Sequence, residues 1–145
     1  IGVRLVGSEM CIRDSYCGEV KFEVDGPVKW WGNCFCEQCQ KMSGAPFVSW
    51  IDFEAGKEKI LDLNNHLKVF ECDHSDRGFC NNCGSSIYFK YRENGHELFG
   101  KDVNGIFFTE ASFNEPPESG PQINIYYDNK PQWFEEMHKL EKRSK

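Results

Sequence analysis

Three cysteines lie close together in the stretch Cys34-Phe35-Cys36-Glu37-Gln38-Cys39. Thiols this close in sequence must also be close in space, and grouped thiolates repel one another unless a cation holds them. In a reducing compartment the cation that suits thiolate sulfur is Zn²⁺, which binds it in a tetrahedral shell. A structural zinc takes four protein ligands, whereas a catalytic zinc takes three and keeps one position open. The spacing Cys-x-Cys-x-x-Cys supplies three ligands.

A second pair of thiols, Cys80–Cys83, has the spacing Cys-x-x-Cys, and Cys17 precedes both groups. These cysteines can be divided in two ways. In the first, the pair Cys36–Cys39 joins the pair 80–83 in one purely structural four-cysteine ribbon, which leaves Cys17 and Cys34 without a role. In the second, Cys17 joins the pair 80–83 in a structural site that is one ligand short. The thiols at 34, 36 and 39 then hold a second zinc with an open position.

The composition narrows the class of protein. Eight cysteines could form disulfides or bind metal, but the Cys-x-x-Cys pairs and the lack of a convincing signal peptide favour metal in the cytoplasm. Lys and Arg number 17 against 23 Asp and Glu, a net charge of −6 without a basic stripe, so we expect no nucleic-acid partner. No apolar run approaches the roughly 20 residues that span a bilayer, so we expect no membrane association. The 145 residues fit one domain, and they indicate no oligomeric state.

Short strands separated by turns must position these thiols. The stretch 20–24 alternates apolar and charged side chains, as a half-buried antiparallel strand does. Residues 73–78 read as a polar loop, and Pro131 begins a helix whose apolar residues share one face. Further strands are expected at 28–31, 45–53, 59–63, 67–72, 87–91, 106–108 and 123–127.

The first fifteen residues do not fit this pattern. They have no initiator Met and no clear period, and the run from Val6 to Ser15 resembles translated sequencing adaptors. We hypothesise that residues 1–15 are a non-native or disordered segment that replaces the natural N-terminus. Sequencing of the parent locus tests this, and an intact native reading frame through residue 10 would contradict it.

Three ordered motifs then carry a family resemblance. The stretches 16–23, 34–44 and 79–85 follow one another as in the glutathione-dependent formaldehyde-activating enzyme family, whose zinc domain is shared with centromere protein V. The chain resembles this family over residues 16–139, which leaves 140–145 as a charged tail. The resemblance implies a mainly β fold, the β-tent, with antiparallel sheets, a short C-terminal helix and two zinc ions.

The resemblance also implies roles for the cysteines. The structural zinc would take Ser15, Cys17, Cys80 and Cys83, but the family has cysteine at the first of these positions. This zinc therefore keeps three sure ligands, with water or Cys11 as the fourth.

The working zinc would take Cys34, Cys36 and Cys39 without a gap. The activity implied is that of a carbon–sulfur lyase or synthase that acts on an adduct of a thiol such as glutathione with a small aldehyde such as formaldehyde.

Other readings stay open beside this one. The competing class is a non-catalytic zinc-binding interaction module. Trp30, Trp31, Phe47 and Trp50 could wall a substrate pocket, although aromatic residues in β proteins mostly form the core. The turn 41–44 could receive a carboxylate or be an ordinary turn. The four histidines, at 66, 74, 96 and 138, lack ligand spacing to any cysteine, and His74 is the strongest candidate among them because it precedes the second thiol pair.

Overall fold

The structure is a computed structural model that describes residues 11–92 and 105–145 of the chain. The strands are β1 Cys11–Asp14, β2 Lys21–Val24, β3 Trp30–Cys34, β4 Val48–Glu54, β5 Glu58–Leu61, β6 Leu67–Glu71, β7 Ser75–Cys80, β8 Ser86–Tyr91, β9 Gly105–Thr109 and β10 Ile123–Ile125. The helices are α1 Glu37–Ser43 and the 3-10 helices η1 Glu110–Ser112, η2 Tyr127–Asn129 and η3 Phe134–Lys139.

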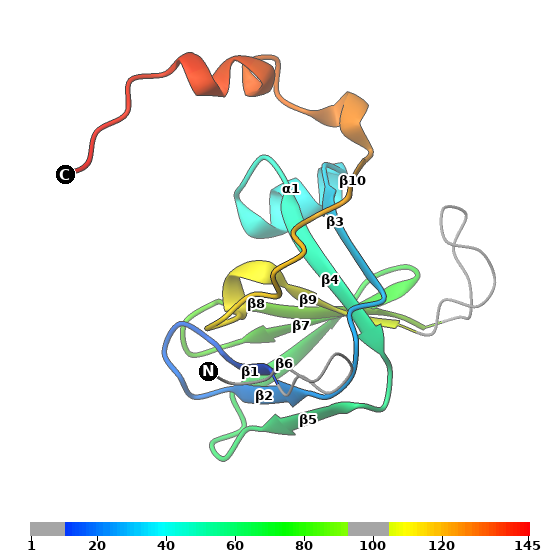
Figure 1. The fold of residues 1–145 in the computed structure, drawn as a ribbon. Coiled ribbons are helices and arrows are strands. Elements are labelled where there is room, and N and C mark those ends of the chain that lie inside the picture. The colour runs from blue at the N-terminus through cyan, green and yellow to red at the C-terminus, as the bar shows by residue number, and fades with distance from the viewer. Residues whose placement is uncertain (1–10, 93–104) are drawn as a thin grey trace.

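Two sheets form the body of the protein, and the mainly β fold expected from the sequence is confirmed (Figure 1). The larger sheet has the order β10-β3-β4-β9-β8-β7-β6, and the smaller one has the order β1-β2-β5. All strand pairs are antiparallel except that of β10 with β3, which is parallel. The parallel pair arises because the chain returns to the β3 edge after a long connection from β9.

The larger sheet buries side chains on both of its faces. Successive side chains of a strand point to opposite faces, so neighbours such as Trp50 and Ile51 of β4 enter different clusters. One cluster joins the two sheets and consists of Phe22, Val24, Trp31, Ile51, Phe53, Ile87, Ile106, Phe108 and Phe113. The other consists of Cys34, Cys39, Val48, Trp50, Phe89 and Phe107. The cysteines of the first group therefore lie in a packed, largely apolar environment.

Strand β7 corrects the expectation of a polar loop at 73–78. Its first four residues, Ser75 to Gly78, are polar or small, which gives a weak strand signal. The strand forms because β6 and β8 pair with it on both sides, with Arg77 opposite Phe70 and Phe89. Tertiary pairing here overrides local preference. Gly78 is needed at this point, because an added Cβ would overlap the ring of Tyr88.

Residues 11–15 of the N-terminal segment belong to the described structure. Strand β1 pairs with β2 and places Arg13 opposite Phe22. Arg13 is buried among the rings of Phe22, Phe53, Phe108 and Phe113. Residues 11–15 are thus part of the described fold, whereas residues 1–10 lie outside it. The non-native origin of the segment and the domain boundaries stay predictions.

The C-terminal segment leaves the body of the protein after β10 and carries η2 and η3 (Figure 1). The expected helix is the 3-10 helix η3, and its apolar face is not buried: Trp133, Met137 and Leu140 are 51%, 48% and 61% exposed. Instead Phe134 anchors the segment, with its ring centroid 5.0 Å from that of Phe35. In residues 11–92 and 105–145, no helix is long and apolar enough to span a membrane.

Candidate metal centres

Cys34, Cys36 and Cys39 form the first thiol group, which we call the inner trio. Their sulfur atoms all lie within 4.8 Å of one another. Cys34 ends β3, where pairing with β4 and β10 holds the backbone on both sides. Cys36 is the N-cap of α1, and its sulfur accepts a hydrogen bond from the Cys39 N–H at 3.3 Å. This first helical turn brings the sulfur of Cys39 back toward the end of β3.

The charges within the inner trio are distributed unequally. Hydrogen bonds from Cys34 and Cys36, together with the Arg77 guanidinium and the Trp50 indole, hold the pKa of Cys39 well below its usual range. Hydrogen bonds with Cys36 and Cys39, together with burial, raise the pKa of Cys34 far above its usual range. The Arg77 guanidinium therefore favours negative charge at the sulfur of Cys39. A bound metal ion would require all three as thiolates, and its binding would release protons.

Cys17, Cys80 and Cys83 form the second group, the outer trio, whose sulfur atoms also lie within 4.8 Å of one another. The sulfurs of Cys17 and Cys80 are 3.7 Å apart. Cys80 ends β7 and Cys83 lies in the following turn, which the hydrogen bond from Gly84 N–H to the Cys80 carbonyl closes at 2.7 Å. The N–H of Tyr16 donates to Ser85 Oγ at 2.9 Å and so ties the residues after β1 to this turn.

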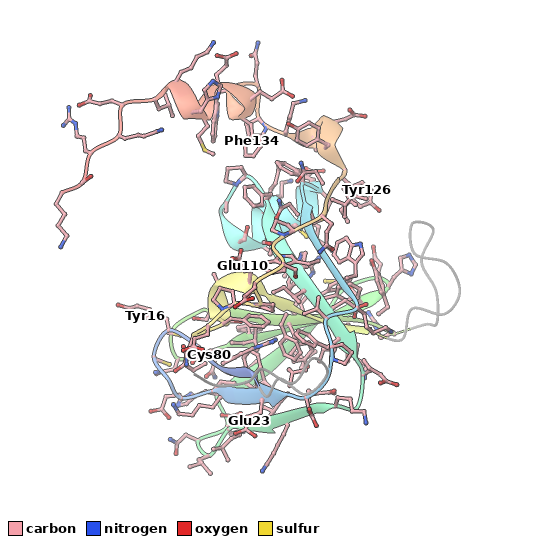
Figure 2. The ribbon with its side chains drawn as sticks, viewed as in Figure 1. Tyr16, Glu23, Cys80, Glu110, Tyr126 and Phe134 are labelled. Carbon is pink, nitrogen blue, oxygen red and sulfur yellow. The ribbon has the colours of Figure 1, made fainter. Side chains whose placement is uncertain are left out.

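The outer trio is more accessible than the inner one. Cys17 is exposed, and the neighbouring Tyr16 points away from the body of the protein (Figure 2). The hydrogen bond with Ser15 lowers the pKa of Cys17. Desolvation opposes ionisation of Cys83, but hydrogen bonds with Ser85 and with the backbone outweigh it and lower its pKa to about 6. The side chain of Cys11, the other candidate ligand here, lies outside what the structure describes.

Both trios fit a zinc ion. Tetrahedral zinc with Zn–S bonds of about 2.3 Å separates its sulfur ligands by about 3.8 Å. The 3.7 Å between Cys17 and Cys80 matches this separation, and the 4.8 Å limit that encloses each trio requires only small side-chain shifts. The pairs 36/39 and 80/83 belong to different groups, so the structure has the second of the two divisions rather than one four-cysteine ribbon. Two cysteine groups are thus compatible with metal binding, and the roles of single residues stay predictions.

A cavity of about 330 Å³ lies beside the inner trio. Trp30, Trp50 and His74, three of the candidates singled out in the sequence, line it. Other candidates do not, since Trp31 is part of the core between the sheets and Phe47 packs against Phe35. The lining consists of Trp30, Cys34, Cys36, Gln38, Cys39, Trp50, Cys72, Asp73, His74, Ser75, Arg77, Phe89, Tyr91, Phe107, Ile125 and Tyr126.

The remaining candidates have structural explanations. Lys41 pairs with Glu37 one helical turn away at 2.7 Å, and Ser43 donates a hydrogen bond to the Cys39 carbonyl at 2.7 Å. His66 contacts Asn81, the residue after Cys80, through its Nδ1 at 2.9 Å, and it belongs to neither thiol group. His138 is exposed on η3, and His96 lies outside the described residues.

Arg77 is the site residue that the sequence did not reveal. It is buried in β7 and reaches the sulfur of Cys39. The polar stretch 73–78 around it predicts a loop, and no local pattern indicates the position of Arg77, because the pairing of β7 within the sheet sets that position.

The comparisons with known proteins agree with this geometry. A family model described as glutathione-dependent formaldehyde-activating enzyme matches residues 10–129. An uncharacterized lyase of Schizosaccharomyces pombe is 29% identical over 66 residues, which are 46% of this chain and 47% of that protein. The match thus spans about half the length of this curated relative. A crystal structure of a Rhodobacter sphaeroides protein superposes with a TM-score of 0.58 at 13% identity, covers 79% of this chain and 99% of that one, and shows the fold alone.

Proposed function

Because the chain belongs to the glutathione-dependent formaldehyde-activating enzyme family, we propose that it is a zinc-dependent carbon–sulfur lyase that also runs as a synthase. Its substrate would be the adduct of a small thiol such as glutathione with a small aldehyde such as formaldehyde. The family and the lyase-named relative support a lyase-type enzyme. The observation that carries the finer proposal is the inner trio, whose three sulfurs converge beside a cavity.

The reaction requires little more than a deprotonated thiol and a positioned aldehyde. In the synthase direction the thiol loses its proton, its sulfur bonds to the aldehyde carbon, the carbonyl π pair moves to oxygen, and that oxygen takes up a proton. The lyase direction reverses each of these steps. A zinc ion held by Cys34, Cys36 and Cys39 would supply the Lewis acidity that lowers the pKa of a substrate thiol.

The protein's own contribution is mainly positional. The cavity of about 330 Å³ is within the size range of small-molecule sites, and aromatic side chains such as Trp30 and Trp50 wall it. Thiols and aldehydes also combine without a catalyst, so holding the two reactants together accounts for much of the effect. In this proposal the outer trio is structural: its ion would join Cys17, just after β1, to Cys80 at the end of β7.

Replacement of one inner ligand tests the proposal. We expect Cys36→Ser to bind one zinc ion fewer per chain. It should also no longer form the hydroxymethyl thioether from glutathione and ¹³C-formaldehyde, a reaction that NMR detects. Its circular dichroism spectrum should match that of the parent protein, because the fold persists. Cys72→Ser is the matched control, because Cys72 lines the same cavity outside the trio. We expect this variant to keep its zinc, because Cys72 belongs to neither thiol group.

Two results would contradict the proposal. Global unfolding of Cys36→Ser would indicate that the inner trio is structural. The absence of saturable glutathione binding and of activity in the parent protein would favour the zinc-binding interaction module instead. A cytoplasmic location stays a prediction.

A further inference from the structure

Arg77 brings a positive charge against the inner trio. It lies in β7 and is 7% exposed. Its Nη2 donates to Gln38 Oε1 at 2.8 Å and to Cys39 Sγ at 3.7 Å. The guanidinium carbon lies 5.9 Å from the ring centroid of Trp50 and 5.3 Å from that of Phe89. Arg77 thus lies between the aromatic wall of the cavity and a predicted metal ligand.

The charge of Arg77 needs an anionic partner. A buried guanidinium is costly unless an anion or good hydrogen bonds compensate it. Across residues 11–92 and 105–145, no carboxylate forms an ion pair with Arg77 within 4.0 Å. The group that Arg77 contacts instead is the sulfur of Cys39, which a bound metal ion would hold as a thiolate.

We propose that Arg77 is a positioning residue for the inner metal site. Three thiolates around a divalent ion carry a net charge of −1, and the guanidinium brings the buried assembly to neutrality. Its two hydrogen bonds also fix Gln38 and the sulfur of Cys39 relative to each other. The inference rests on the metal site of the proposed function, but it concerns how strongly that site holds its ion.

Two replacements of Arg77 separate charge from packing. Arg77→Met keeps much of the buried stem and removes the charge, whereas Arg77→Lys keeps the charge and loses the planar fork. We expect Arg77→Met to weaken Co²⁺ binding at the inner trio by about 10- to 100-fold, as losses of hydrogen bonds to metal ligands commonly do. The sulfur-to-cobalt charge-transfer band should shift as well. Arg77→Lys should recover most of the affinity.

The protein contains its own control. Co²⁺ affinity at the outer trio should stay unchanged in both variants, since Arg77 contacts none of its sulfurs within the described structure. Cys17→Ser and Cys36→Ser assign the two sets of bands to their groups. Arg92→Met is a further control, because Arg92, which follows β8, pairs with Asp76 of β7 at 3.1 Å. We expect it to change neither affinity.

Clear outcomes would overturn the inference. Unchanged Co²⁺ affinity of the inner trio in Arg77→Met would do so. Equal weakening of Co²⁺ binding in Arg77→Met and Arg77→Lys would also do so, because it would mean that the packing of Arg77 and not its charge supports the site. If Arg77→Met loses both sites through unfolding, Arg77→Lys decides: retained affinity supports the inference, and loss at the inner trio alone overturns it. These titrations use neither thiol nor aldehyde, so their result is independent of whether the protein is a lyase.

Discussion

The Oγ of Ser15 lies 3.4 Å from the Sγ of Cys17. The serine is 3% exposed, and its oxygen also accepts a hydrogen bond from the Val20 N–H at 3.3 Å. Ser15 therefore stands beside the outer trio, at the position where the family resemblance leads us to expect cysteine. A neutral hydroxyl is a poorer zinc ligand than a thiolate.

We predict that Ser15→Cys tightens zinc binding at the outer trio by more than about tenfold, or about 1.4 kcal/mol. The added thiolate completes a four-sulfur shell, and because metal-binding energy becomes folding energy, the Tm should rise as well. Competition with a chromophoric chelator measures the affinity. Ser119→Cys, which adds an exposed thiol elsewhere, is the control. Equal affinities for the parent and Ser15→Cys would show that residue 15 does not reach the ion.

The C-terminal segment is predicted to stabilise the fold around the inner trio and to slow the loss of metal from it. Phe134 packs on Phe35, which is fully buried between Cys34 and Cys36, and on Phe47 at 5.7 Å between ring centroids. We expect Phe134→Ala to lower the free energy of unfolding by about 1–2 kcal/mol and to speed metal loss from the inner trio. Stopped-flow release to a chelator measures this rate. Met137→Ala, at a half-exposed position of η3, should leave the rate unchanged. Equal rates in the two variants would mean that the segment does not support the site.

Asp52 is predicted to make stability depend on pH. Burial raises the pKa of this carboxyl from 3.8 to about 6, although Lys29 partly offsets the effect. The folded state therefore binds more protons than the unfolded state between about pH 4 and 6. The contribution of the neutral Asp52 carboxyl to the free energy of unfolding is therefore fully present below pH 4, and it is lost as the pH rises through 6.

Asp52→Asn should remove this dependence. We expect the free energy of unfolding of the variant to rise by about 1–3 kcal/mol relative to that of the parent as the pH increases from 4 to 7. Urea unfolding measures this difference. The acid sensitivity of the thiol groups cancels when the free energy of unfolding of the parent is subtracted from that of the variant at each pH. Asp25→Asn, at an exposed turn, controls for the loss of one negative charge. A difference that does not change with pH would show that Asp52 has no raised pKa in the folded protein.

The two metal groups are predicted to release zinc at different rates. Cys17 is exposed, whereas Cys34 and Cys39 are buried. We expect about two zinc ions per chain, with a fast phase of release to a mild chelator from the outer trio and a slow phase from the inner one. Cys17→Ser should abolish the fast phase and Cys36→Ser the slow one. A single phase that both variants abolish would mean that the two groups do not bind metal independently.

The sequence alone determined the features that depend on residues close together in the chain. The inner trio spans only residues 34–39, so one strand end and one helical turn are enough to gather its sulfurs. Alternation in 20–24 likewise predicted β2, because the period of a strand is a local property. The three cysteine motifs were also enough to indicate the family, which the family comparison confirms.

Tertiary structure decided what distant segments do to one another. Cys17 meets Cys80 across 63 positions of sequence, and Arg77 meets Cys39 across 38. Neither distance can be read from spacing, since sheet pairing and not the intervening sequence sets it. Strand β7 shows this most directly: its own residues favour a loop, yet β6 and β8 pair with it on both sides and thereby carry Arg77 to the thiols.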